Sequence, residues 1–360
     1  MESKENKRIN LGFKIFIILL IGIILLFSKK ENQEKFIDFI QVVKSSSIDL
    51  KVIESFPIES NIDNIAFYNK GIMIWKDKKL TRLSLKGSKE WEKEFILDEP
   101  HAVFGEKGIY IYEKSTGDIY FLDSSGETEE KIELNTSINN IVEGFENIIV
   151  HNQKTNMESL NILDKKGNII VSNLIDDKNI LTYCINENST EYALSALNLN
   201  EENIKSELQV FNLDGKISST SQFDNEIILY SNYIEDDKIL VMSDKSLYVY
   251  NKGNILWQKE FQLIKDIYVN KEKINILYGN TLEILSFDGM MEEKYSFAEE
   301  YKKIIAFDKY ITLYGEEYII GLRDGKEIFK YKSEDPILKV VEGSQNLIVV
   351  YEDRIDLVKR

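Results

Sequence analysis

The chain has 360 residues, of which 43% are hydrophobic and 29% are charged, a composition typical of globular proteins and not of disordered ones. Its 45 Lys and Arg stand against 61 Asp and Glu, and the resulting net charge of -16 argues against general nucleic-acid binding, which needs a basic face to neutralise phosphates. A single cysteine excludes an internal disulfide framework and a Cys-rich zinc site.

The first element is an apolar run at residues 11–28, composed almost entirely of Ile, Leu, Phe and Gly. As a helix it would span about 27 Å, close to the hydrocarbon thickness of a bilayer. A cleaved signal peptide is the alternative, but the residues after the run offer no small-residue cleavage site. We therefore expect residues 1–10 to be a cytoplasmic tail and residues 11–28 to be a transmembrane signal anchor in the lipid bilayer.

The orientation of this anchor is not decided by charge. Lys4, Lys7 and Arg8 precede the run, and Lys29, Lys30 and Lys35 follow it, so the positive-inside rule is balanced. A short basic tail before an apolar core is typical of a translocation signal, which favours a single-pass protein of the cell membrane whose bulk is extracytoplasmic. Residues 29–46 carry a helical stripe of apolar side chains and are expected to form a juxtamembrane stalk.

Residues 47–360 show a repeat of short strands rich in Ile, Val, Tyr and Phe. A turn glycine follows an apolar strand seven times, at spacings of 36 to 48 residues, and each glycine permits the positive φ of a tight hairpin. These glycines are Gly87, Gly126, Gly167, Gly215, Gly253, Gly289 and Gly325. Each unit contains four short strands, which is the pattern of a β-propeller blade.

The last repeat unit has only three strands before the chain stops, and a spare strand at residues 48–53 precedes the first full unit. Joining the two ends in one blade would close the ring and remove exposed sheet edges. The sequence therefore predicts an all-β fold, an eight-bladed β-propeller with an N-terminal transmembrane helix. Seven blades is the alternative, if the irregular fourth unit is not a separate blade.

Two motifs within the repeat resemble a known family. Leu122-Asp123-Ser-Ser-Gly126 is similar to the Leu-Asp-x-x-Gly turn of the quinoprotein (PQQ-like) propeller repeat. Gly87-x-x-x-Trp91 and Gly253-x-x-x-Trp257 are similar to its Gly-x-x-x-Trp element. The resemblance covers residues 47–360 and implies that each tryptophan packs between neighbouring blades. The arrangement also resembles uncharacterised membrane-anchored propellers, with a domain of unknown function, from low-GC Gram-positive bacteria.

The resemblance implies a fold and not an activity. Quinoprotein alcohol dehydrogenases use adjacent cysteines beside the cofactor, whereas this chain has Cys184 alone, so that redox chemistry is not expected. His101 and His151 lie at the ends of predicted strands and are interpreted as structural or surface groups. No nucleophile-elbow, Walker or zinc-protease motif is present. We therefore expect no catalytic residues and no metal site.

Paired acids recur where one blade is expected to lead into the next. Five of the seven connections would carry two carboxylates toward one rim of the ring, and we predict that this acidic rim binds a cation or a basic ligand. The alternative is that the pairs only reflect an acidic chain. The residues are Asp98, Glu99, Asp176, Asp177, Asp224, Glu226, Glu299, Glu300, Glu334 and Asp335.

These features together favour a non-catalytic scaffold or recognition module of the cell envelope, with an envelope protein or a basic ligand as partner. We expect no cofactor, with Ca²⁺ as the alternative that clustered carboxylates would bind. The competing function is an extracellular hydrolase or lyase that uses carboxylates at the propeller channel. A deep pocket with two carboxylates, at least one of raised pKa, would favour the enzyme.

Overall fold

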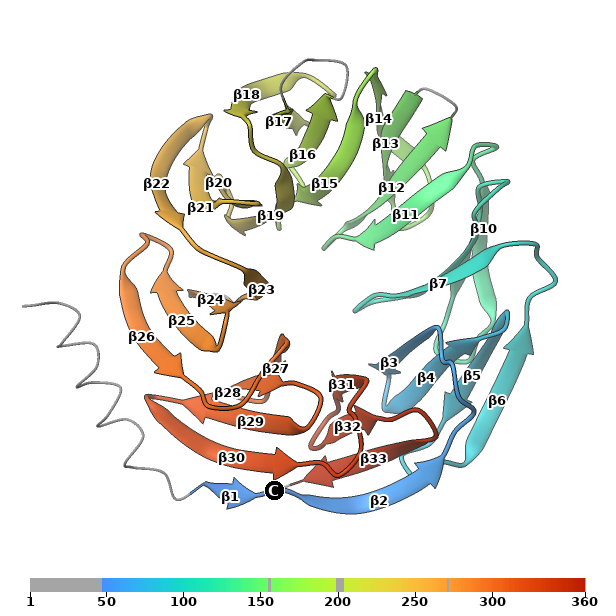
Figure 1. Cartoon of the computed structure of the whole chain (residues 1–360). Coiled ribbons are helices and arrows are strands. Elements are labelled where there is room, and N and C mark those ends of the chain that lie inside the picture. The colour runs from blue at the N-terminus through green and yellow to red at the C-terminus, as the bar shows by residue number, and fades with distance from the viewer. Residues whose placement is uncertain (1–46, 155–156, 199–203, 271, 360) are drawn as a thin grey trace, which may run out of the picture.

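The computed structural model describes residues 47–154, 157–198, 204–270 and 272–359. The predicted tail, anchor and stalk at residues 1–46 lie outside the described residues. Within the described ranges, no helix is long and apolar enough to cross a membrane. The strands form a ring of eight sheets around a central axis, so the predicted all-β, eight-bladed propeller is confirmed and the seven-bladed alternative is wrong (Figure 1).

The first four blades follow one another along the chain. The first contains β3 (Asn64–Tyr68), β4 (Gly71–Lys76), β5 (Lys79–Leu83) and β6 (Lys89–Glu94). The second contains β7 (Pro100–Phe104), β8 (Ile109–Glu113), β9 (Asp118–Leu122) and β10 (Thr128–Glu133). The third contains β11 (Ile138–Glu143), β12 (Asn147–Lys154), β13 (Met157–Asp164) and β14 (Ile169–Asp176). The fourth contains β15 (Asn179–Ile185), β16 (Glu191–Asn198), β17 (Lys205–Asn212) and β18 (Ile217–Asp224).

The remaining blades complete the ring. The fifth contains β19 (Ile228–Glu235), β20 (Lys238–Ser243), β21 (Ser246–Asn251) and β22 (Asn254–Glu260). The sixth contains β23 (Ile264–Val269), β24 (Lys273–Tyr278), β25 (Thr281–Ser286) and β26 (Met291–Ser296). The seventh contains β27 (Lys303–Phe307), β28 (Tyr310–Tyr314), β29 (Tyr318–Arg323) and β30 (Lys326–Lys332). The eighth contains β31 (Lys339–Glu342), β32 (Leu347–Val350), β33 (Arg354–Lys359) and the N-terminal β2 (Lys51–Pro57).

The eighth blade joins the two ends of the described chain. β2 pairs antiparallel with β33 as the outermost strand of that blade. The strand expected at 48–53 is instead divided, because β1 (Ile48–Asp49) pairs in parallel with β30 of the seventh blade. Between the two, the Leu50 side chain is buried in a cluster with Phe329 and Val358, and its N–H donates to Lys330 O. Burial of Leu50 between two blades thus moves the closing strand to 51–57.

The turn glycines adopt the conformation that the repeat predicts. All seven have positive φ, from 72° at Gly325 to 83° at Gly167, and each lies between the third and fourth strands of its blade. A side chain from the outer strand of the preceding blade packs against most of these glycines. A Cβ on Gly126 would lie 2.8 Å from the Trp91 ring, and one on Gly289 would lie 2.8 Å from the Trp257 ring.

The two tryptophans therefore pack between blades, as the resemblance implies. Trp257 adds a hydrogen bond, from its Nε1 to Phe287 O of the next blade at 2.8 Å. Ile132 fills the same place against Gly167, and Phe56 fills it against Gly87. The glycine turn recurs along the chain, whereas the side chain that packs against it differs from blade to blade. The repeat is therefore regular in geometry but degenerate in sequence.

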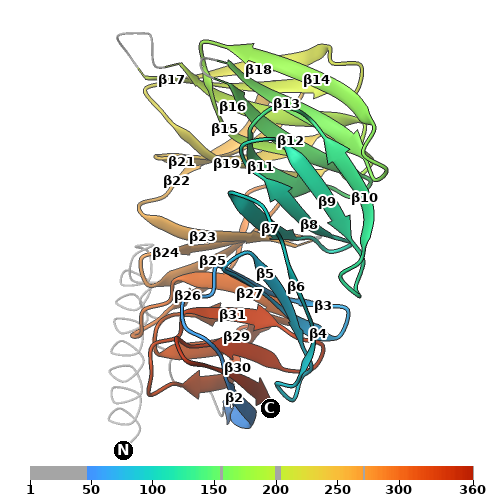
Figure 2. The ribbon, with the colours of Figure 1, turned by 90° about the vertical axis from the view of Figure 1, so that its right-hand side faces the viewer.

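The antiparallel strands give the ring two distinct faces, and Figure 2 shows the ring from its side. The connections from a fourth strand to the next first strand lie on one face, called here the connection face. The turns between first and second strands lie on the opposite face, called here the turn face. The innermost strands line the axis, so a residue at the end of a first strand lies near the mouth of the ring on the turn face.

Candidate functional site

The ten predicted rim acids all lie at connections between blades. Asp98 and Glu99 stand between β6 and β7, and Glu334 and Asp335 stand between β30 and β31. Asp176 and Asp224 end β14 and β18, respectively. Nine of the ten are exposed, and Glu226 is half-buried.

Several of these carboxylates are already engaged by the protein itself. Glu226 accepts hydrogen bonds from the hydroxyls of Ser243 and Tyr248 within its own blade. Glu300 pairs with Lys265 Nζ at 3.0 Å, and Asp335 pairs with Arg354 Nη2 at 2.8 Å. The connection face therefore carries the predicted residues but not five equivalent pairs of free charges.

Glu113, which the repeat did not single out, holds one of these connections in place. Its side chain is buried, and its two carboxylate oxygens accept hydrogen bonds from the backbone N–H of Asp98 and Glu99, at 2.8 and 2.9 Å. A buried carboxylate that accepts backbone hydrogen bonds is a structural anchor. It holds the connection between β6 and β7 in position.

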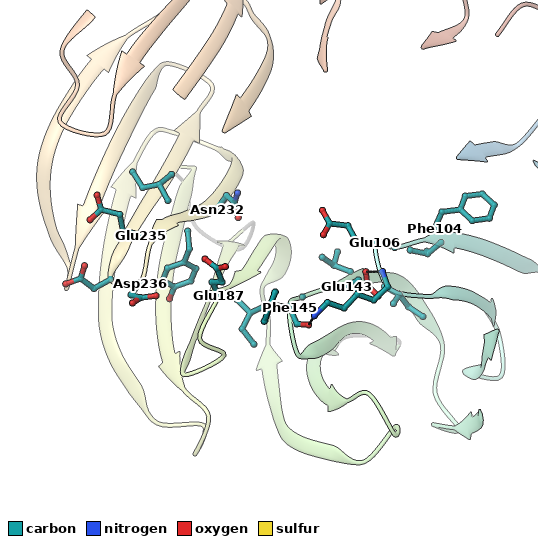
Figure 3. A pocket seen from close by; sticks show the side chains of 18 residues that line it. Phe104, Glu106, Glu143, Phe145, Glu187, Asn232, Glu235 and Asp236 are labelled. Atoms are coloured by element: carbon teal, nitrogen blue, oxygen red, sulfur yellow. Dashed lines mark hydrogen bonds between the residues drawn. The ribbon is translucent and has the colours of Figure 1, made fainter. Parts of the chain in front are cut away.

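The structure places a second candidate site on the turn face. A cavity of about 1140 Å³ opens at the mouth of the ring, lined by the ends of the first strands and the following turns of the second to fifth blades. The lining residues fall at 103–107, 141–145, 185, 187 and 232–237. Apolar side chains, among them Val103, Ile141 and Ile234, line the cavity together with a set of carboxylates (Figure 3).

Six carboxylates line this cavity against one ammonium group, that of Lys107. The six are Glu106, Glu143, Glu187, Glu235, Asp236 and Asp237. Glu235 pairs with Lys238 at 3.1 Å. By contrast, the side chains of Glu106, Glu187 and Asp236 are exposed and make no ion pair or hydrogen bond with the residues that the structure describes.

These three carboxylates come from three different blades. Figure 3 shows them around the same hollow, each at the end of a first strand or in the turn that follows it. Because the walls of a cavity exclude part of the solvent, charges of one sign on its rim focus the potential toward its centre. The arrangement is suited to a cationic group with an apolar stem.

Glu143 has a different environment from the three free acids. Its carboxylate accepts hydrogen bonds from the Tyr110 hydroxyl and from Lys107 N–H, and Lys165 Nζ lies 3.2 Å away. Burial raises the pKa of Glu143, but these donors and the Lys165 charge more than offset it, so its pKa lies below the ordinary value. Gly105 permits this contact, since a Cβ there would lie 2.3 Å from Glu143 Oε2.

An exposed aromatic ring stands at the same mouth. Phe145 is half-exposed, and Lys107 Nζ lies 3.6 Å from its ring centroid while donating a 2.6 Å hydrogen bond to Phe145 O. This is a close cation–π contact. The face of Phe145 thus already accepts an ammonium group from the protein itself.

The two histidines and the cysteine have structural surroundings. His151 is buried, with Nε2 3.1 Å from Glu158 Oε2, and His101 is exposed and stacks on Tyr112. Burial raises the pKa of the Cys184 thiol to about 12. Among the described residues, no group of three or more His, Cys, Asp or Glu side chains is arranged to hold a metal ion.

The fold and the cavity define an eight-bladed β-propeller with an acidic hollow at the mouth of its turn face. The chain belongs to the DUF5711 family, a family of unknown function, which matches residues 44–359. Among curated proteins, none matches the sequence.

Solved propellers share the fold at low sequence identity. BamB from Moraxella catarrhalis is 10% identical with a TM-score of 0.58, covering 86% of this chain and 100% of its own. The C-terminal WD40 domain of Sif2 is 12% identical with a TM-score of 0.64, covering 88% and 99%. Chaetomium thermophilum Sqt1, bound to the N-terminus of the ribosomal protein L10, is 10% identical with a TM-score of 0.58, covering 87% and 100%. At this identity the likeness establishes the fold alone.

Proposed function

We propose that this protein is a membrane-anchored, extracytoplasmic recognition module that binds a Lys- or Arg-bearing segment of an envelope protein, without catalysis. The observation that carries the proposal is the cavity on the turn face, where free carboxylates of three blades surround apolar side chains. A lysine or arginine side chain combines a cationic head with an apolar stem and matches both features. Another propeller of this fold, Chaetomium thermophilum Sqt1, binds a protein segment, the N-terminus of the ribosomal protein L10.

The environment of Glu143 favours binding over acid–base catalysis. A general acid of a glycoside hydrolase needs a raised pKa. The buried carboxylate of this cavity, Glu143, has a lowered pKa and is saturated by donors. Burial does raise the pKa of Glu342, but this residue ends β31 of the eighth blade and does not line the cavity.

Two finer parts of the proposal rest on the sequence. The packing of Trp91 and Trp257 on the next blade supports a relationship to the PQQ-like repeat, while the lone Cys184 argues against quinoprotein dehydrogenase activity. The apolar run at residues 11–28 supports membrane anchoring. A reporter fused to the C-terminus should be active only outside the cell, and cytoplasmic activity would contradict the proposed topology.

Binding is tested with the full chain in detergent micelles and a labelled nonapeptide of alternating Lys and Leu, with the Glu and Leu analogue as the negative probe. The triple variant Glu106→Gln, Glu187→Gln and Asp236→Asn removes the free cavity charges without changing side-chain size. At about 0.5 kcal/mol for each exposed charge, affinity should fall about tenfold. Raising the salt concentration should weaken wild-type binding.

The matched control neutralises three exposed acids on the connection face, by Asp98→Asn, Glu99→Gln and Glu334→Gln. This variant removes the same net charge, so it separates a local effect from the influence of the overall -16 balance. We expect it to bind nearly as well as the wild type. Loss of binding in the control alone would move the site to the predicted acidic rim, and no binding of the Lys peptide would refute the proposal.

A further inference from the structure

The outer strand of the third blade, β14, differs from most other outer strands of the ring. Its sequence from Ile169 to Ile175 has no charged residue, and Asp176 ends the strand. The outer strands of six blades, β2, β6, β10, β22, β26 and β30, each carry at least two charged residues. Charged side chains on edge strands are the usual protection against pairing with another chain. β14 lacks this protection.

β14 also exposes apolar side chains. Ile169, Ile170 and Leu174 are 53%, 44% and 57% exposed. In the fourth blade, β18 is equally long and also has its only charge at its last residue, but it exposes one large apolar side chain, Ile217. An uncharged, proline-free segment of high β propensity at a sheet edge is a template for strand addition.

The backbone of β14 is available for such pairing. It is the terminal strand of its sheet, and among the described strands none pairs with its outer edge. The seventh blade shows that an outer edge of this ring accepts one more strand, because β1 pairs with β30 there. Addition of a strand at an outer edge is therefore compatible with the geometry of the blades, although β1 adds in parallel and over two residues only.

The ends of β14 indicate which strand it pairs with. Lys166, which is exposed, precedes the strand, and Asp176, also exposed, ends it. In an antiparallel pair of identical strands, Lys166 of each copy lies near the end of the other strand that carries Asp176. The pair therefore brings opposite charges together at both ends. A parallel pair would set Lys166 beside Lys166. The strand is thus complementary to itself in the antiparallel sense, as a two-fold symmetric interface requires.

We propose that two copies of this protein associate through antiparallel pairing of β14, which joins the third blades into one continuous sheet across a two-fold axis. Ile170 and Leu174 of the two copies cover one another, and the backbone groups of both edges become hydrogen-bonded. This interface lies on the perimeter of the ring, away from the cavity, and the inference does not depend on the proposed function.

The test is cross-linking of the full chain in membranes by a short bis-maleimide, using the variant Ser172→Cys. Ser172 is exposed on β14, and the native Cys184 is buried, so the wild type gives the background. The matched control is Thr220→Cys, at the equivalent exposed position of β18, where Thr220 pairs with Gln209 as Ser172 pairs with Asn161. We expect a cross-linked dimer with Ser172→Cys and only background with Thr220→Cys.

A second substitution tests the pairing itself. Adding Leu174→Lys to Ser172→Cys places like charges in the interface and should lower the dimer yield about tenfold. Because Leu174 is more than half exposed, thermal unfolding of this variant should stay unchanged, which excludes misfolding as the cause. The proposal would be overturned by equal yields for the two cysteine positions or by no effect of Leu174→Lys. A product heavier or lighter than a dimer would also overturn it, because it would show another protein on β14.

Discussion

The closing strand offers the sharpest test of how this ring is held together. Phe56 on β2 is 7% exposed and packs in a cluster with Ile65 of the first blade and Ile355 of the eighth. A Cβ on Gly87 would lie 2.4 Å from the Phe56 ring. Phe56 therefore connects the last blade to the first, and Phe56→Ala should destabilise the whole ring.

The size of the effect follows from this burial. Truncating a buried phenylalanine costs about 3–5 kcal/mol, because transfer energy is lost and a cavity remains. For about 310 residues, an unfolding entropy of about 2.1 cal/mol/K per residue amounts to about 0.65 kcal/mol/K. A loss of about 4 kcal/mol should thus lower Tm by about 6 °C.

The assay is thermal unfolding of the full chain in detergent, followed by circular dichroism, with a urea titration for the free energy of unfolding. The matched control is Ile53→Ala on the same strand, where the side chain is 54% exposed. Ile53→Ala should lower the free energy of unfolding by less than about 1 kcal/mol, and Tm by about 1–2 °C. If both variants lose the same small amount, β2 does not close the ring in solution and the reasoning is refuted.

Two further predictions concern the pH dependence and the turns. Burial lowers the pKa of His151, and Glu158 offsets this only in part. As the pH falls through about 6.5, the unfolded chain takes up a proton that the folded chain does not, so the free energy of unfolding falls. His151→Gln should therefore flatten the dependence of Tm on pH between about 7.5 and 5.5. An unchanged slope would contradict this. Gly167→Ala should destabilise more than Gly325→Ala in urea titrations, since a Cβ at Gly167 would lie 2.1 Å from Ile132 Cδ1 whereas Gly325 has open space. Equal losses would mean that the contact between blades contributes nothing.

The acidic residues show where sequence patterns stop being informative. The repeat placed Asp98, Glu99 and the other paired acids at connections between blades, because the turn glycines set the register. It could not show that Glu226, Glu300 and Asp335 are paired by other side chains. Such partners depend on rotamers and on the distance between strands, which spacing along a chain does not contain.

The cavity was missed for a related reason. Its free carboxylates lie in short turns of three blades, and Glu106 and Asp236 are separated by some three repeats, so no spacing links them. The Asp236-Asp237 pair was a visible signal, but it falls in a turn between a first and a second strand and not at a connection. Knowing that such turns share one face of the ring would have drawn attention to it.

The sequence by itself determined the local units, with positive φ at the repeated glycines and four strands in each unit, and it favoured eight units over seven. These follow from backbone stereochemistry and alternation, which act over a few residues. The tertiary structure decided where the ring closes, since burial of Leu50 between two blades divides the expected strand. It also decided which charges meet at the mouth of the turn face, because only closure of eight units brings residues from different blades around one hollow.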